Sequence, residues 1–523
     1  MLRKIGLLLN TIKYLKPVQF QYQLRFRLKK PLPLTAYRHP YRPEQLQLPS
    51  FTASPPQPSM ASKTGKDFRF LNITQTFDDH IDWNFQTHGK LWNYNLQYAN
   101  YLLQDGLSSE IKKALWHSLH EWLYSGELSL EPYPVSLRVI NGIRFLSASD
   151  APDAEMLSDM HAELTFLTKR LEFHLLGNHL LENYFALLMG GAMFSEQSWI
   201  MKAEKGLQKQ LNAQVLRDGA HFELSPMYHQ IILFRMLELL DWYAKWKDKK
   251  PDFESFIKRM AVKMLTWLQQ ISFQNGDIPH FNDSATGIAP PTSWLLQYGS
   301  LLKIDPDKQQ ASPDDSGYRK FDIGNYECRI DAAAIGASYQ PGHAHADALS
   351  FILYVNGYPM LTEQGTSTYQ IGARRNLERS TGAHNTVVIN NQNQSQVWGG
   401  FRVGRRAKVR IESETGNSFA ASHDGYQKQG VIHRRHFQFQ TDRIIITDEL
   451  TGETASACAF FHFHPSLSKL HIDLNKIIEF KHAHDVIEEP YKMAEGYNRY
   501  LEGIRIKATF KNKLITIIHV NRI

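Results

Sequence analysis

A dense group of potential metal ligands and reactive imidazoles lies in the second half of the chain. The segment Gly-His-Ala-His-Ala-Asp spans residues 342–347, and Glu363 and His384 follow it. Imidazole nitrogens and carboxylate oxygens are common ligands of divalent metals. If the segment is a strand, His343 and His345 point to the same face. The pattern therefore predicts a metal ligand beside a second imidazole that is free for chemistry.

Two polar clusters interrupt the apolar sequence of the first half. One is Gly-Asn-His-Leu-Leu-Glu-Asn at 177–183, where His179 and Glu182 share a face if the segment is helical. A pocket lined by these two side chains is one interpretation. A helix that Asn178 caps and against which His179 packs is an equally good one.

The second cluster, Asp-Gly-Ala-His-Phe-Glu-Leu-Ser-Pro-Met-Tyr-His, occupies residues 218–229. Tyr228 follows a proline turn and opens a predicted helix, so its phenol can reach a groove, although a single tyrosine is more often a packing residue. β-Elimination beside a carboxylate needs a group that neutralises the acid, a base for the α-proton and an acid for the leaving oxygen. An amide, an imidazole and a phenol in one groove would supply these groups.

The elements that position these residues fall into two classes along the chain. At 523 residues the chain is too long for one ordinary core, so two or more domains are expected. Apolar residues recur at helical spacing in the first half and in short strand-like runs in the second half. The helical blocks are 111–124, 156–176, 180–194, 230–246 and 253–271, and the strand-like runs are 349–355, 386–389, 408–411, 436–440, 443–447, 459–464 and 514–520. Helices first and strands afterwards indicate two segregated domains.

The N-terminal segment is basic. Ten Lys and Arg lie between Arg3 and Arg42 with no acidic residue before Glu44, and subtracting them from the net charge of +7 leaves −3 for the rest. This distribution gives no support to nucleic-acid binding. The arm is expected to contact an anionic membrane surface or an acidic polymer, or to be a solvated tail. Residues 43–66, rich in Pro, Ser, Thr and Gln, are predicted to be a linker or surface wrap.

Cysteine content and hydropathy exclude further classes. With only Cys328 and Cys458, neither a disulfide framework nor a cysteine-based zinc site is expected. The apolar run 5–9 is too short to cross a bilayer and no small-residue cleavage site follows it. We therefore expect no transmembrane segment and no signal peptide. This favours a cytoplasmic protein, and the oligomeric state is left open.

Four motifs in order resemble the heparinase II/III family of bacterial polysaccharide lyases. They are the segments 177–183, 218–229, 342–351 and 383–387. The resemblance implies an (α/α) toroid of helix hairpins followed by an antiparallel β-sandwich, with the polysaccharide between them. It places a basic arm and linker at 1–66, the helical domain at 67–304 and the β domain at 318–523.

The resemblance also implies roles for single residues. Asn178 and His179 would neutralise the C5 carboxylate of a uronate, Tyr228 would act as base and acid, and His343 would assist. The predicted substrate-binding residues are Glu182 and Arg138. The predicted ligands of a structural zinc ion are His345, Glu363 and His384, although two histidines that simply hydrogen-bond Glu363 are a simpler alternative.

The sequence thus predicts a lyase that cleaves a uronate-containing acidic polysaccharide by β-elimination. The resemblance and such a substrate imply a periplasmic location as the alternative to the cytoplasmic one. One alternative is a glycoside hydrolase on the same helical fold, with Asp218 and Glu223 as acid and base. Another is a protein of exopolysaccharide assembly that binds or trims an acidic glycan.

Overall fold

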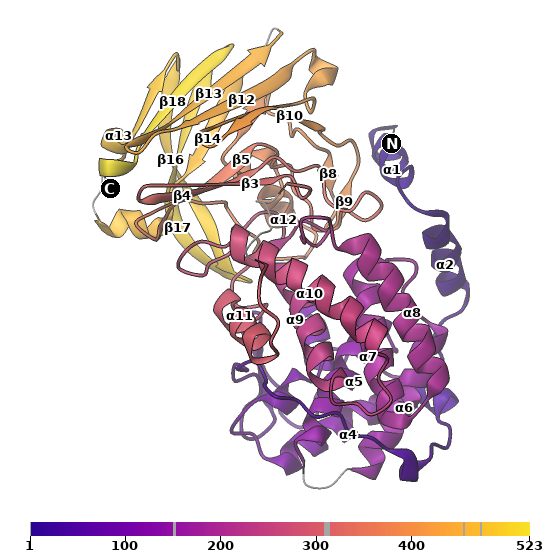
Figure 1. The fold of residues 1–523 in the computed structure, drawn as a ribbon. Helices are drawn as coiled ribbons and strands as arrows, with labels where there is room; N and C mark the ends of the chain where they lie inside the picture. The colour runs from indigo at the N-terminus through magenta and orange to yellow at the C-terminus, as the bar shows by residue number, and fades with distance from the viewer. Residues whose placement is uncertain (1, 150–152, 308–313, 453–455, 471–472, 523) are drawn as a thin grey trace.

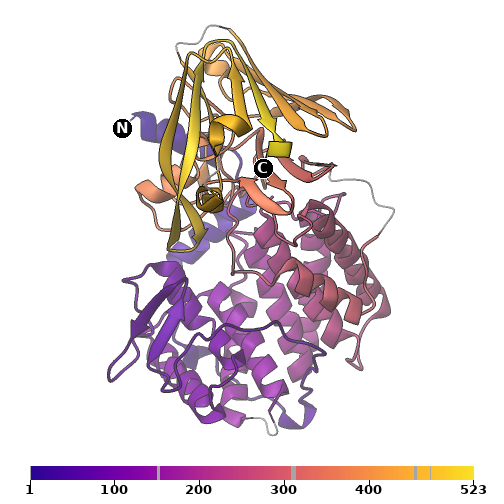
Figure 2. The ribbon, with the colours of Figure 1, turned by 90° about the vertical axis from the view of Figure 1, so that its left-hand side faces the viewer.

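The computed structural model describes residues 2–149, 153–307, 314–452, 456–470 and 473–522 (Figure 1). Helices fill the first part of the chain and antiparallel sheets fill the second, so the predicted order of an α domain followed by a β domain is confirmed. The two-stranded sheet β1 (Asp67–Phe70) and β2 (Ile73–Thr76) precedes the main helices. The β domain lies on one end of the helical domain in both views (Figures 1 and 2).

The helices of the helical domain pack around one apolar core, and α7 is buried on nearly all sides within it. Several of them begin with a cap or a proline: Asp153 accepts hydrogen bonds from the first turn of α6, and Pro226 and Pro251 are the first residues of α9 and α10. Proline suits this position because its missing N–H would have no partner there. The helices are α3 (Lys90–Gln97), α4 (Ser109–Ser125), α5 (Pro132–Ser147), α6 (Ala154–Lys169), α7 (Gly177–Phe194), α8 (Gln197–Gln214), α9 (Pro226–Tyr243), α10 (Pro251–Ile271) and α11 (Thr292–Leu301).

Three larger antiparallel sheets form the β domain, in the orders β10-β11-β12-β13-β18-β15, β16-β17-β14-β7 and β3-β4-β5-β6. Inward-facing side chains of all three share one core, which includes Phe351, Phe437 and Phe461. The strands are β3 (Tyr318–Ile323), β4 (Tyr326–Asp331), β5 (Ser350–Val355), β6 (Tyr358–Leu361), β7 (Val387–Ile389), β8 (Val397–Trp398), β9 (Arg402–Val403), β10 (Val409–Thr415), β11 (Ser418–His423), β12 (Ile432–Phe439), β13 (Arg443–Thr451), β14 (Ala457–His462), β15 (Ile478–Lys481), β16 (Asp485–Gly496), β17 (Arg499–Phe510) and β18 (Lys513–His519). Two short helices, α12 (Ala373–Glu378) and α13 (Leu474–Ile477), complete it.

The two domains meet through a packed, partly apolar seam. Phe273, after α10, stacks on Tyr354 of β5 with ring centroids 3.7 Å apart. Arg329 of β4 is fully buried at the seam and donates hydrogen bonds to the carbonyl oxygens of Ile271 and Ser272, each 2.9 Å away. These contacts hold the helical and β faces of the candidate site against each other.

The N-terminal segment forms two helices, α1 (Leu2–Ile12) and α2 (Pro17–Leu28), at the outer edge of the molecule (Figure 1). The chain then wraps the helical domain: Leu34 is buried in its core, and the Thr52 hydroxyl donates to Asp241 of α9. No helix among the described residues combines the length and the apolar character needed to cross a membrane.

The expectation that His343 and His345 lie in a strand is wrong. Residues 341–349 are irregular, and β5 begins only at Ser350. The loop satisfies its backbone elsewhere: the His343 carbonyl accepts the Asp283 N–H at 3.0 Å, and the His345 N–H donates to the Asn282 side chain at 2.8 Å. Because another loop supplies these partners, the segment needs no strand neighbour.

Candidate active site at the domain seam

The site centres on a stacked pair of side chains from the two domains. Tyr228, in the first turn of α9, and His343, in the loop before β5, lie with ring centroids 3.8 Å apart and ring planes at 28°. Ser225 caps α9, since its hydroxyl accepts the Tyr228 N–H at 3.2 Å. The cap and Pro226 fix where the helix starts. They therefore determine where the phenol meets the β domain.

Glu223 joins the start of α7 to this pair. Its carboxylate accepts the Asn178 backbone N–H at 3.0 Å and the Asn178 side-chain amide at 2.8 Å, and it lies 3.7 Å from Nε2 of His343. Thus Glu223 caps α7 from outside, as a carboxylate at a helix N-terminus should. The approach requires Gly177, because a Cβ there would lie 2.4 Å from the Glu223 carboxylate. Asn178 keeps a second amide N–H for a ligand.

His179 lies beside Asn178 and is about one-third exposed. Its ring packs on Tyr133 at 4.2 Å between centroids, and Nδ1 lies 3.2 Å from the Glu172 carboxylate. Burial by itself lowers the pKa of His179, but the carboxylates of Glu172, Glu223 and Glu182 outweigh it and raise the pKa above 6.5. The raised pKa favours the cationic imidazolium, which can attract an acidic ligand.

Asp283 connects the site to the interior of the β domain. Its two carboxylate oxygens face different histidines: Oδ2 lies 3.0 Å from Nδ1 of His343, and Oδ1 lies 2.9 Å from Nε2 of His345. Arg375 of α12 forms a bidentate ion pair with the same carboxylate and is fully buried with it. Although burial alone would raise the pKa of Asp283, Arg375 and both histidines hold it well below its usual value. The resulting carboxylate fixes the orientation of both imidazoles.

The Tyr228 hydroxyl faces a further tyrosine. Its oxygen lies 3.2 Å from the hydroxyl oxygen of Tyr369, and the Tyr369 ring packs edge-on against Tyr497. Burial chiefly raises the pKa of Tyr228 well above 10, and the negative charges of Asp283 and Glu223 add to the effect. The resting side chain is therefore a neutral phenol, which is an acid rather than a base.

Several of these residues have only weak signals in the sequence. Asp283 lies in the polar segment 275–284, which the sequence predicts to be an inter-helix loop that could line the groove, and Glu223 is predicted only as a carboxylate of the hydrolase alternative. Tyr369 and Arg375 carry no local motif, because their roles depend on the fold of the loop after β6.

The two predicted substrate-binding residues are buried among helices. Arg138 of α5 forms an ion pair with Glu163 and donates to the Gln97 carbonyl at 2.8 Å, and only 1% of its side chain is exposed. Glu182 is equally buried, with its carboxylate 2.9 Å from Nε of Arg235. Both side chains are buried and have polar partners inside the helical domain, so a role in positioning other groups fits their surroundings better than direct substrate contact.

Asp218, one carboxylate of the hydrolase alternative, is held by backbone N–H groups. Asp218 is buried, and its carboxylate accepts the backbone N–H groups of Ala220 at 3.1 Å and of Ser316 at 2.8 Å. It thereby ties the turn before α9 to the segment that enters β3. A carboxylate held in this way is poorly placed as a catalytic acid or base.

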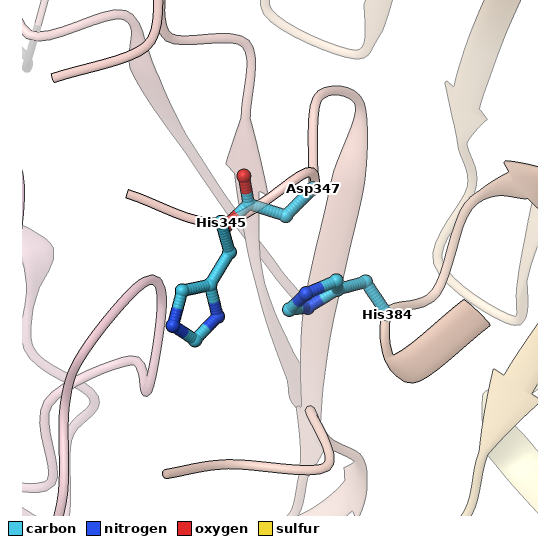
Figure 3. Close-up of side chains that lie close together, drawn as sticks. All are labelled: His345, Asp347 and His384. Atoms are coloured by element: carbon cyan, nitrogen blue, oxygen red, sulfur yellow. The ribbon is translucent and has the colours of Figure 1, made fainter. Parts of the chain in front are cut away.

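Next to the stacked pair, three buried side chains could hold a metal ion. His345, Asp347 and His384 each offer one ligand atom, and these atoms lie within 4.8 Å of one another. Figure 3 shows the two imidazole rings facing each other, with Asp347 beside them. The predicted set contained Glu363 instead of Asp347. Glu363 contacts Nδ1 of His384 and the Ser350 hydroxyl, so it lies behind a ligand and outside the group.

The donor set suits a divalent metal. His345 Nδ1, His384 Nε2 and one Asp347 carboxylate oxygen are buried without a hydrogen-bond partner. The other nitrogen of each imidazole is held by a carboxylate, Asp283 or Glu363, as is usual for metal-binding histidines. Burial lowers the pKa of His345 to about 4 and that of His384 well below 6.5, so both rings are neutral, the form that binds metal.

Comparison with known proteins agrees with this architecture. The Heparinase II/III N-terminus model matches residues 144–313, and the Heparinase II/III-like, C-terminal model matches residues 305–505. A heparin-sulfate lyase of Bacteroides stercoris is 25% identical over 306 residues, which are 53% of this chain and 44% of that protein. A heparin-sulfate lyase of Pedobacter heparinus is 25% identical over 338 residues, 59% of this chain and 49% of that protein.

The chain spans about half the length of these curated relatives. A crystal structure of heparinase III has the same fold, with a TM-score of 0.67 and 16% identity, covering 93% of this chain and 88% of that chain. Two adjoining family models and a shared two-domain fold lead to one conclusion: the chain belongs to the heparinase II/III family.

Proposed function

We propose that this protein is a polysaccharide lyase that cleaves a uronate-containing acidic glycan by β-elimination. The observation that carries the proposal is the stacking of Tyr228 from the helical domain on His343 from the β domain, with Asn178 joined to the same pair through Glu223. The heparin-sulfate lyases among the relatives support the same class of substrate.

In the proposed reaction the uronate carboxylate binds at the start of α7. The free amide N–H of Asn178 and the imidazolium of His179 would share its charge, which acidifies the neighbouring C5–H bond. The carboxylates of Glu172 and Glu223 keep His179 cationic. Both groups would therefore stabilise the negative charge that moves onto the carboxylate as the C5–H bond breaks.

The elimination moves one proton and breaks one glycosidic bond. The C5–H bond breaks and its electrons form the C4–C5 double bond, while the C4–O bond breaks and the leaving oxygen takes a proton; water is not consumed. The neutral phenol of Tyr228 is prepared to donate the proton to the leaving oxygen. To take the C5 proton, Tyr228 must first pass its own proton to a base, a role we give to His343; the C5 proton then restores the phenol, which transfers it to the leaving oxygen. His343, held by Asp283 and stacked on the ring, assists this half of the reaction.

We also propose zinc as the metal of the His345, Asp347 and His384 group. Two histidines and a carboxylate are a common zinc ligand set. A bound ion would fix the β-domain loops through charge and geometry. Its effect would reach the reaction only indirectly, since Asp283 holds both His345 and His343.

The test is ultraviolet absorbance of the purified protein with a panel of acidic polysaccharides, including heparan sulfate, alginate and bacterial exopolysaccharides. A lyase produces an absorbing unsaturated uronate with every cut. New reducing ends without absorbance would identify a hydrolase and contradict the proposal. Binding without cleavage of any polymer would instead favour a role in glycan assembly.

A further inference from the structure

The two N-terminal helices carry an outward apolar surface that the candidate active site does not use. We define the arm surface by the exposed side chains Ile5, Leu8 and Leu9 of α1 and Phe20, Leu24 and Leu28 of α2. Large apolar side chains at helical spacing on a solvent face are unusual in a soluble domain. Such a surface is typical of a site that binds a partner or a membrane.

The opposite face of α2 already has its partners. Gln19 is buried, Tyr22 packs on Phe173 with ring centroids 4.8 Å apart, and Phe26 packs edge-on against His174 at 4.8 Å. These inward positions recur three and four residues apart, as one helix face requires. The face toward the protein is thus filled, and α2 is held on the helical domain.

The outward face of α2 is nearly opposite. Phe20, Leu24 and Leu28 recur every four residues, and they are 42%, 60% and 75% exposed. At about 100° per residue, this stripe lies on the far side from Gln19, Tyr22 and Phe26. The helix is therefore apolar on both faces, and only one of them is satisfied by the fold.

The helix α1 repeats the pattern against the β domain. Its end is anchored because the Trp398 indole N–H donates to the Thr11 hydroxyl at 3.1 Å, and the Arg406 guanidinium stacks over Tyr14 at 3.7 Å. Ile5, Leu8 and Leu9 take no part in these anchoring contacts and are 46%, 46% and 63% exposed. Both helices lie along the same outer edge of the molecule (Figure 1).

The charge around the arm surface selects its partner. Arg25, Arg27, Lys29 and Lys30 flank or follow the α2 stripe, and no acidic residue occurs before Glu44. Apolar side chains bordered by Lys and Arg are the composition of helices that lie in a membrane interface. An acidic polysaccharide would satisfy the basic residues but not Phe20, Leu24 and Leu28.

We propose that the arm surface docks this protein on an anionic membrane, with α1 and α2 lying in the interface and the rest of the molecule outside it. The inference is independent of the proposed lyase activity. Each basic residue near the surface should strengthen binding roughly fivefold, and salt should weaken it.

The experiment is sedimentation of the full chain with vesicles of phosphatidylcholine alone or mixed with phosphatidylglycerol. We expect binding to the anionic vesicles only, and a loss of at least tenfold in the triple variant Phe20→Glu, Leu24→Glu, Leu28→Glu. The matched control is Met201→Glu, Leu301→Glu, Tyr358→Glu, which places three glutamates at exposed apolar positions elsewhere. It should bind like the unmodified chain. Circular dichroism of both variants verifies folding.

Three results would overturn the proposal. They are no binding to anionic vesicles at low salt, equal losses of vesicle binding in the two triple variants, and unchanged vesicle binding in the variant Phe20→Glu, Leu24→Glu, Leu28→Glu. A parallel measurement on immobilised heparin separates the other candidate partner. If the quadruple variant Arg25→Ser, Arg27→Ser, Lys29→Ser, Lys30→Ser loses heparin binding while no vesicle binds the protein, the arm is a polysaccharide-binding element instead.

Discussion

Replacing Tyr228 by Phe should abolish turnover and leave the fold nearly unchanged. The ring that stacks on His343 is kept, and only the hydroxyl that lies 3.2 Å from Tyr369 is lost. One hydrogen bond of this kind contributes about 0.5–1.5 kcal/mol to the free energy of unfolding. Loss of a group that transfers protons costs about 10²–10⁴-fold in rate, or roughly 3–5 kcal/mol of transition-state stabilisation.

The matched control is Tyr369→Phe, which removes the other end of the same hydrogen bond. It should reduce stability by a similar amount, but it should lower kcat by less than about tenfold, because Tyr369 is assigned no proton transfer. The assay is initial rate of ultraviolet absorbance on the best substrate of the panel, with urea unfolding measured on both variants. The reasoning is refuted if Tyr228→Phe keeps more than about a tenth of the activity, or if both variants lose equal activity.

Three further perturbations test the surroundings of this pair. Asp283→Asn leaves Arg375 buried without its charged partner, so the free energy of unfolding measured in urea should fall by about 3–5 kcal/mol. A change under about 1 kcal/mol would contradict the role of Asp283 as the buried partner of Arg375 and both histidines. For His179, whose folded pKa is raised, the stabilisation by its carboxylate neighbours is present below the unfolded pKa and lost as the pH rises through the folded one. The stability difference between the native protein and His179→Gln should therefore be larger at about pH 5.5 than at about pH 8.5, and a pH-independent difference would argue against an imidazolium. Added zinc should raise the thermal midpoint of the native protein by an amount equivalent to about 2.7 kcal/mol at a hundredfold excess over Kd. His384→Ala should remove this rise, and the control His436→Gln should keep it. The site would be rejected if metal analysis finds no zinc in the native protein or in the control after loading.

Local pattern was enough to predict the order of the domains and most long elements. The blocks 180–194 and 253–271 lie within α7 and α10, and the runs 349–355 and 443–447 correspond to β5 and β13. Periodicity identifies α10 and β13 because one face of each is buried against a core. The segments α7 and β5 are buried on nearly all sides and appear in the sequence as dense apolar runs. The prediction of a single helical block over 156–176 is wrong, because α6 ends at Lys169 and α7 starts at Gly177.

The sequence by itself determined which chemical groups are available: the amide and imidazole at the start of α7, the phenol at the start of α9, and the histidines before β5 and at residue 384. Their types and short motifs are local properties. Tertiary structure alone decided what each group contacts. It enclosed Arg138 between helices, put Asp347 in the metal group and Glu363 behind it, and made Asp283 the common partner of His343 and His345. These contacts join residues that are far apart in the chain. Burial and charge depend on how close the side chains lie in space, and the spacing of residues along the sequence does not encode that closeness.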